Sequence, residues 1–120
     1  MQYLLLCYVD DEKRSYNLSG DEGRALYGSY VAYRQALQDA GVFVGSNALQ
    51  AVSTATQVRV SDGKTTVLDG PYPDTKEQLG GYFLIEAPDL DSALAWAARC
   101  PAATEGTVEV RPIMPTPVSV

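Results

Sequence analysis

The chain has 120 residues, a formal charge of −6, an apolar share of 46% and no histidine. This length fits a single domain that buries its own hydrophobic core. The acidic balance, with its cations scattered along the chain, argues against direct binding of DNA or RNA, and apolar runs no longer than a strand exclude a membrane span.

The N-terminal third predicts a strand followed by a helix. Residues 2–9 are an apolar run of strand length, and the chain start lacks the basic segment and cleavage site of a secretory signal, so we expect a cytoplasmic protein. Ser19 and Glu22 have the spacing of a capping box at a helix start. Apolar residues then recur at steps of three and four up to Gly41, a C′ glycine. This stripe consists of Leu26, Tyr30, Tyr33, Leu37 and Ala40.

The middle of the chain predicts strands joined by a tight turn. Residues 42–44 are typical of a short strand. A second strand with one packed face is predicted by a run of period two. Asp62-Gly63 connects that run to residues 64–68 and is a strong hairpin signal, because both positions accept positive φ. The period-two run consists of Thr54, Thr56, Val58 and Val60.

The C-terminal third repeats the order of strand, helix and strand. After a polar loop at residues 69–78, residues 82–86 predict a strand. Pro88-Asp89 begins a second helix and Pro101 ends it. A last strand is predicted at residues 107–111, and a proline-spaced tail follows at residues 113–120. The buried stripe of the second helix is predicted to consist of Leu90, Leu94 and Ala97 or Ala98.

The order of elements predicts an α+β domain at residues 1–112. Two strand–helix–strand halves flanking a hairpin favour a ferredoxin-like antiparallel sheet with both helices on one face. The strands carry apolar residues on both sides, so the second face needs a cover. A second copy of the chain would provide it, and we therefore expect a homodimer.

The absence of histidine and the low number of cysteines limit the kinds of catalytic and metal site that the chain can form. Without histidine the chain lacks the usual proton shuttle near neutral pH, the serine and cysteine triads and most zinc or iron ligand sets. Cys7 and Cys100 are too few for a disulfide scaffold and have no metal-binding spacing, so we predict two inert, small hydrophobic residues. We expect no cofactor.

The segment 69–82 is the candidate site. Its carboxylates, hydroxyls and glycines can form the polar edge of a cleft, with the Gly80-Gly81 backbone open to a ligand. Turn chemistry alone also explains every residue type there. The carboxylates of Asp69, Asp74 and Glu77 have no coordination spacing, so we expect no metal site.

Residues 69–72 and 75–82 resemble the signature of the DGPF group of YCII-related proteins, with Tyr72 in place of the phenylalanine. The resemblance extends to residues 3–6, 48–49, 54–60, 88–101 and 108–112. It implies a ferredoxin-like fold and the dimeric α+β barrel of the wider superfamily. That superfamily includes lyase-like and isomerase-like enzymes, some with a histidine–aspartate pair that this chain lacks. Genes for extracytoplasmic-function sigma factors often neighbour such members, which implies an accessory role in transcriptional signalling and a sigma-factor association.

The first functional hypothesis is a small-molecule-binding or sensing dimer, with its pocket between the sheet and segment 69–82. The alternatives are a cofactor-independent lyase or isomerase, with Asp69 as the carboxylate base, and a protein-interaction module without a ligand. The residues predicted to contact a ligand are Tyr30, Tyr33, Arg59, Gly70, Pro71, Thr75, Lys76, Glu77, Gly81 and Tyr82.

Overall fold

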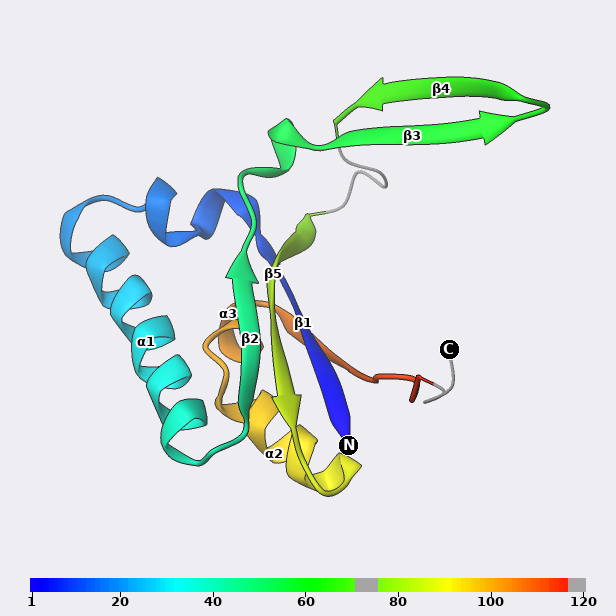
Figure 1. The fold of residues 1–120 in the computed structure, drawn as a ribbon. Helices are drawn as coiled ribbons and strands as arrows, with labels where there is room; N and C mark the ends of the chain where they lie inside the picture. The colour runs from blue at the N-terminus through cyan, green and yellow to red at the C-terminus, as the bar shows by residue number, and fades with distance from the viewer. Residues whose placement is uncertain (71–75, 117–120) are drawn as a thin grey trace.

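The computed structural model describes residues 1–70 and 76–116. Two helices, a four-stranded sheet and a two-stranded arm make up most of it (Figure 1). In chain order the elements are β1 (Gln2–Asp10), the 3-10 turns η1 (Asp11–Lys13) and η2 (Ser15–Asn17), α1 (Gly20–Asp39), β2 (Phe43–Ala48), the 3-10 turn η3 (Val52–Thr54), β3 (Thr56–Ser61), β4 (Lys64–Asp69), β5 (Glu77–Glu86), α2 (Leu90–Arg99), the short α3 (Ala102–Glu105) and β6 (Thr107–Pro112).

The main sheet has the strand order β2-β5-β1-β6, and every neighbouring pair is antiparallel. The two strand–helix–strand halves therefore interleave in one sheet, and the predicted ferredoxin-like α+β fold is confirmed. Because side chains alternate along a strand, one face of β1 is buried beneath the helices. The buried residues of β1 are Tyr3, Leu5, Cys7 and Val9.

The core joins α1, the sheet and α2. Leu5, Leu37 and Ile85 are fully buried. The Tyr33 ring meets the Phe83 ring edge to face, with centroids 5.0 Å apart. The Tyr33 hydroxyl donates a 2.7 Å hydrogen bond to the Trp96 carbonyl, which satisfies its polar end inside the core. Tyr33 is therefore a packing residue between the two helices.

Helix α1 begins and ends where the sequence predicts, but the predicted capping hydrogen bond at its N-terminus is absent. Ser19 is the N-cap residue, but its side chain makes no capping hydrogen bond, so the predicted capping box is wrong. At the other end the Gly41 amide donates to Gln38 and the Val42 amide donates to Leu37. This pair of bonds is a Schellman motif, and Gly41 supplies its positive φ of 73°.

Helix α2 is rotated from the predicted orientation. Asp89 caps it by accepting a 2.8 Å hydrogen bond from the Ser92 amide. Ala93 and Ala97 are buried, whereas Leu90 and Leu94 are each 46% exposed, so the predicted leucine stripe is wrong. Alanines let the helix approach the sheet closely, which a leucine face does not allow. Within the described residues, no helix combines the length and apolarity needed to cross a bilayer.

Within the described part of the chain, no element covers the face of the sheet opposite the helices. Leu4, Leu6 and Tyr8 of β1 and Leu84 of β5 are only partly buried there. Leu4 lies directly opposite Leu84 in the strand register. We call the surface formed by these four residues the open sheet face.

The predicted hairpin is present as an arm that projects from the main sheet (Figure 1). Asp62 and Gly63 form its turn with φ values of 51° and 75°, as a hairpin turn of this type requires. The predicted packed face of β3 is wrong, since Val58 and Val60 are 62% and 67% exposed. A period-two pattern predicts a strand. It does not tell whether other residues bury the apolar side chains of that strand.

Candidate functional site

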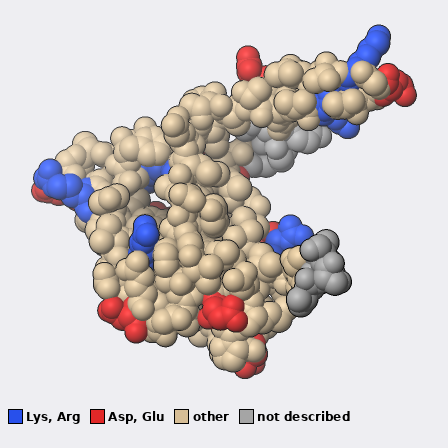
Figure 2. Space-filling model, in the orientation of Figure 1, with Lys and Arg blue, Asp and Glu red and all other residues tan. Residues whose placement is uncertain are grey.

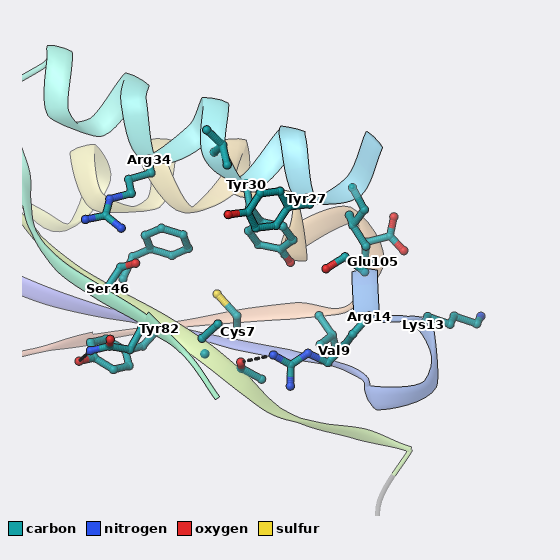
Figure 3. Close-up of a pocket in the computed structure, with 18 of the residues that line it drawn as sticks. Cys7, Val9, Lys13, Arg14, Tyr27, Tyr30, Arg34, Ser46, Tyr82 and Glu105 are labelled. Atoms are coloured by element: carbon teal, nitrogen blue, oxygen red, sulfur yellow. Dashed lines mark hydrogen bonds between the residues drawn. The ribbon is translucent and has the colours of Figure 1, made fainter. Parts of the chain in front are cut away.

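A pocket of about 330 Å³ lies between the middle of α1 and the helix-covered face of the sheet (Figure 3). Helix α1 forms one wall, β1, β2 and β5 form the floor, and the turns after β1 close one end. The lining residues are Cys7, Val9, Asp10, Lys13, Arg14, Ser15, Leu26, Tyr27, Tyr30, Val31, Arg34, Ser46, Asn47, Ala48, Gly80, Gly81, Tyr82, Phe83 and Glu105.

The pocket exists because neighbouring positions of α1 pack differently. Tyr33 and Leu37 are buried against the sheet. Beneath the lining residues of α1 the floor includes small residues, such as Ser46 and Gly81, which leave space below α1 unfilled. Tyr27 above them is 65% exposed.

Gly81 sets the spacing of the floor strands. A Cβ atom on Gly81 would lie 2.8 Å from the Asn47 carbonyl oxygen and 3.2 Å from the Ala48 Cα. Both atoms belong to the β2 backbone, which cannot move aside as a flexible side chain can. Glycine at this position therefore lets β2 and β5 pair closely along the floor of the pocket.

Arg14 joins three segments at one end of the pocket. Its guanidinium donates to the Leu49 carbonyl at 2.7 Å and to the Gly80 carbonyl at 3.0 Å. It also contacts the Asp11 carboxylate at 3.5 Å and lies 4.9 Å from the centroid of the Tyr16 ring. These contacts tie the turn after β1 to the ends of β2 and β5, so Arg14 holds the shape of the pocket.

Arg34 is the cation most available to a ligand. It extends from α1 toward Ser46 on the sheet side of the pocket (Figure 3). Its guanidinium carbon lies 4.8 Å from the centroid of the Phe43 ring. This stacking orients the planar group while leaving its edge donors directed sideways.

Two tyrosines of α1 supply hydroxyls to the pocket. Tyr27 and Tyr30 both line it and stand three residues apart on one face of α1. Burial raises the pKa of Tyr30, and the nearby Cys100, Cys7 and Glu105 raise it further. The Tyr30 hydroxyl is therefore protonated at neutral pH and acts as a hydrogen-bond donor.

The pocket gathers cations although the chain is acidic. Lys13, Arg14 and Arg34 line it together with the carboxylates of Asp10 and Glu105. These five groups sum to +1, and Asp11, which contacts Arg14 at 3.5 Å, brings the sum to zero, against −6 for the whole chain. A neutral pocket repels a negatively charged ligand less than the rest of the chain does.

Cys7 borders the pocket as a neutral thiol. Its sulfur lies 3.8 Å from the sulfur of Cys100, and both cysteines are free and buried. The hydrogen bond to Cys100 and burial raise the pKa of Cys7 well above its ordinary value. Because the thiolate is the nucleophile, the Cys7 sulfur is inert, in agreement with the prediction that Cys7 serves as a small hydrophobic residue. The same hydrogen bond lowers the pKa of Cys100.

The structure brings three of the predicted ligand residues to this pocket: Tyr30, Gly81 and Tyr82. Tyr82 contributes only backbone, because its side chain lies on the other side of the sheet, where its hydroxyl accepts a 2.8 Å hydrogen bond from Asn47 (Figure 3). Tyr33 belongs to the core instead.

The other predicted residues lie outside the lining. Asp69 and Arg59 are exposed on the arm, and Gly70 lies at its base, where its amide donates to the Ala55 carbonyl. Lys76 is exposed just before β5. Glu77 accepts a hydrogen bond from the Thr107 hydroxyl at 3.0 Å. Pro71, Asp74 and Thr75 fall outside the described residues.

The sequence analysis did not identify Arg34, Tyr27 or Arg14 as lining residues. A signal for the first two exists, because Tyr27, Tyr30 and Arg34 follow one another at steps of three and four on one helix face. Arg14 has no such signal, since its role depends on carbonyls distant in sequence. Among residues 1–70 and 76–116, no three histidine, cysteine or acidic residues are grouped closely enough to hold a metal ion.

Comparison with known proteins supports the fold and the family. The model of the YCII-related domain matches residues 1–117. An uncharacterized protein from Rhizobium meliloti is 36% identical over 115 residues, which cover 94% of this chain and 92% of that protein. A solved structure with a similar fold is 5-chloro-2-hydroxyhydroquinone dehydrochlorinase from Burkholderia phenoliruptrix, in complex with 2,5-dihydroxybenzoquinone. Its TM-score is 0.54 at 13% identity, with 95% of this chain and 94% of that chain covered.

Proposed function

Because this chain belongs to the YCII-related domain family, we propose that its α1–sheet pocket binds a small organic anion. The observation that carries this proposal is the position of Arg34, which lines the pocket and extends from α1 toward Ser46 (Figure 3). The charges at the pocket balance in a chain of net charge −6, so an anion is repelled less there than by the rest of the chain.

The proposed ligand is a small planar molecule with an ionised oxygen. A volume of about 330 Å³ lies at the lower end of the range for small-molecule sites. The rings of Tyr27 and Tyr30 suit a flat ligand. The Arg34 guanidinium matches a carboxylate or phenolate, and a protonated Tyr30 hydroxyl can donate to the same group.

A concrete probe comes from the dehydrochlorinase of similar fold, whose structure holds 2,5-dihydroxybenzoquinone. This molecule is small, planar and acidic, so it has each property that the pocket favours. We expect isothermal titration calorimetry to detect its binding to the wild-type chain.

Arg34→Gln tests the site. Loss of a charge-assisted hydrogen bond to the ligand removes about 1.5–3 kcal/mol of binding free energy, so Kd should rise by about tenfold or more. Arg99→Gln is the matched control. Arg99 also lies on a helix and stacks on an aromatic ring, that of Trp96, with its guanidinium carbon 4.4 Å from the ring centroid, but it does not line the pocket. Equal loss of affinity in the two variants would contradict the proposal.

A lyase or isomerase is the second candidate, favoured by the two carboxylates in the pocket wall. Asp10 and Glu105 can remove a proton, and the Tyr30 hydroxyl can donate to the oxyanion that forms. Asp69 has less support as the base because it is exposed on the arm. Replacement of each carboxylate by its amide would lower turnover while keeping ligand affinity if this candidate is correct.

We also propose that the protein acts as a homodimer through the open sheet face. Leu4, Leu6 and Leu84 of that face remain partly exposed in one chain, and a second copy would bury them. Association with a sigma factor stays a prediction. Binding of a protein partner with no small-molecule affinity in the pocket would favour the interaction module instead.

A further inference from the structure

The arm carries an apolar face that is exposed among residues 1–70 and 76–116. In the register of β3 and β4, Val58 lies opposite Val67, and Val60 lies opposite Thr65. Residues opposite each other share a face of the hairpin, so Val58, Val60 and Val67 lie together. They are 62%, 67% and 58% exposed. We call this surface the valine face.

The arm has a defined shape despite its exposure. Six register pairs from Thr56–Asp69 to Ser61–Lys64 connect its strands without a bulge. A two-stranded hairpin is marginally stable alone in water. Apart from Gln57, which is partly buried, every residue of β3 and β4 is exposed. Packing against another surface would account for a regular arm with three aligned valines.

The area of the interface favours a second copy as that surface. The main sheet has strands of 9, 6, 10 and 6 residues. With strands about 4.8 Å apart and about 3.4 Å per residue, its whole face opposite the helices has a projected area of only about 500 Å². A stable interface buries about 800 Å² per partner. The arm, with two strands of 6 residues each, adds about 200 Å². A dimer that includes the arms therefore approaches the size that a stable pair needs.

The charge of the arm also suits a second copy. The arm carries Arg59 and Lys64 against Asp62 and Asp69, so its net charge is zero. The chain as a whole carries −6. A neutral arm can approach an acidic copy of the chain without the electrostatic repulsion that acts between the acidic remainders of the two chains. Figure 2 shows it extending away from the body, with paired charges near its tip.

We propose that the arm reaches across to a second copy of the chain and packs its valine face on that copy, extending the contact between the two open sheet faces. This proposal rests on the homodimer proposed above. It adds the arm as an element that stabilises the dimer, and this contact is the function we propose for the arm.

The first test is sedimentation equilibrium of a variant with Val58→Lys and Val67→Glu. The two new side chains face each other across the hairpin and attract, so the arm itself is retained, and the net charge is unchanged. We expect the dimer dissociation constant to rise at least tenfold. The control, Arg59→Lys with Thr66→Glu, places the same pair on the opposite face, because Arg59 lies opposite Thr66. It should stay within about threefold of wild type.

The second test locates the contact. A photo-crosslinking residue, p-benzoylphenylalanine, replaces Val60 in one preparation and Thr66 in another, and each is mixed with isotope-labelled wild-type chain. Crosslinks from position 60, but not from position 66, to the labelled chain would support the proposal. Crosslinks from position 60 only within its own chain would overturn it. A wild-type dimer unaffected by the valine substitutions would overturn the role of the arm alone, whereas a wild-type monomer would overturn the homodimer as well.

Discussion

At the scale of single residues, the pocket depends on glycine at its floor. Gly81→Ala would bring a methyl group to within 2.8 Å of the Asn47 carbonyl. We expect a loss of about 1–3 kcal/mol in the free energy of unfolding, typical of overpacking, measured by urea denaturation. Gly45→Ala is the control, because a Cβ at Gly45 meets nothing within 4 Å. A Gly81 variant as stable as the Gly45 variant would contradict this role.

Residue identity alone did not predict this pocket. Tyr30, Gly81 and Tyr82 were predicted ligand residues, and all three line it, but they were assigned to a cleft at segment 69–82. The difference between the predicted cleft and this pocket has a physical cause. Polar, glycine-rich segments are easily seen in a sequence, whereas a cavity arises where packing fails, here beneath the middle of α1.

At the scale of elements, one leucine in each helix shows which face of that helix is buried. Leu37 of α1 is fully buried and Leu94 of α2 is 46% exposed. Leu37→Ala should cost about 2–5 kcal/mol of unfolding free energy, because it leaves a cavity in the core. Leu94→Ala should change stability by only about 0.5 kcal/mol. Thermal or urea denaturation measures both, and equal losses would mean that α2 faces the sheet through its leucines.

The N-cap of α2 predicts a pH dependence. The Ser92 backbone amide donates to Asp89 and lowers the pKa of this carboxyl. The folded pKa lies below the unfolded value, so the stabilisation is present at neutral pH and is lost as the pH falls through the folded pKa. Asp89→Ala should therefore lower the urea midpoint at pH 7, and its difference from wild type should narrow in acid. A difference that is the same at both pH values would rule out the ionised cap.

The elements that the sequence predicts correctly are those with local signals. The hairpin follows from Asp62-Gly63, and the end of α1 follows from Gly41, because backbone conformation at these glycines is decided locally. The buried face of α2 and the exposure of the arm depend on contacts distant in sequence. Helix α2 can bury either Leu90 and Leu94 or Ala93 and Ala97, and only the approach distance to the sheet selects the alanines.

At the scale of the whole molecule, the fold leaves two regions for interaction on opposite sides of the sheet. The pocket lies beneath α1, and the open sheet face with Leu4 and Leu84 lies on the other side. The order of elements predicted this architecture, because two strand–helix–strand halves can place their helices on one face only. Under the proposals above, one side binds the ligand and the other binds the second copy.

The central claim is that the ligand binds beneath α1 and not at the arm. Titration of the isotope-labelled chain with 2,5-dihydroxybenzoquinone, followed by amide NMR shifts, tests this directly. We predict the largest shifts at Tyr30, Ala48 and Gly81, with little change at Arg59 and Asp69. Shifts centred on Asp69, or no shifts at millimolar probe together with no heat in calorimetry, would contradict the account.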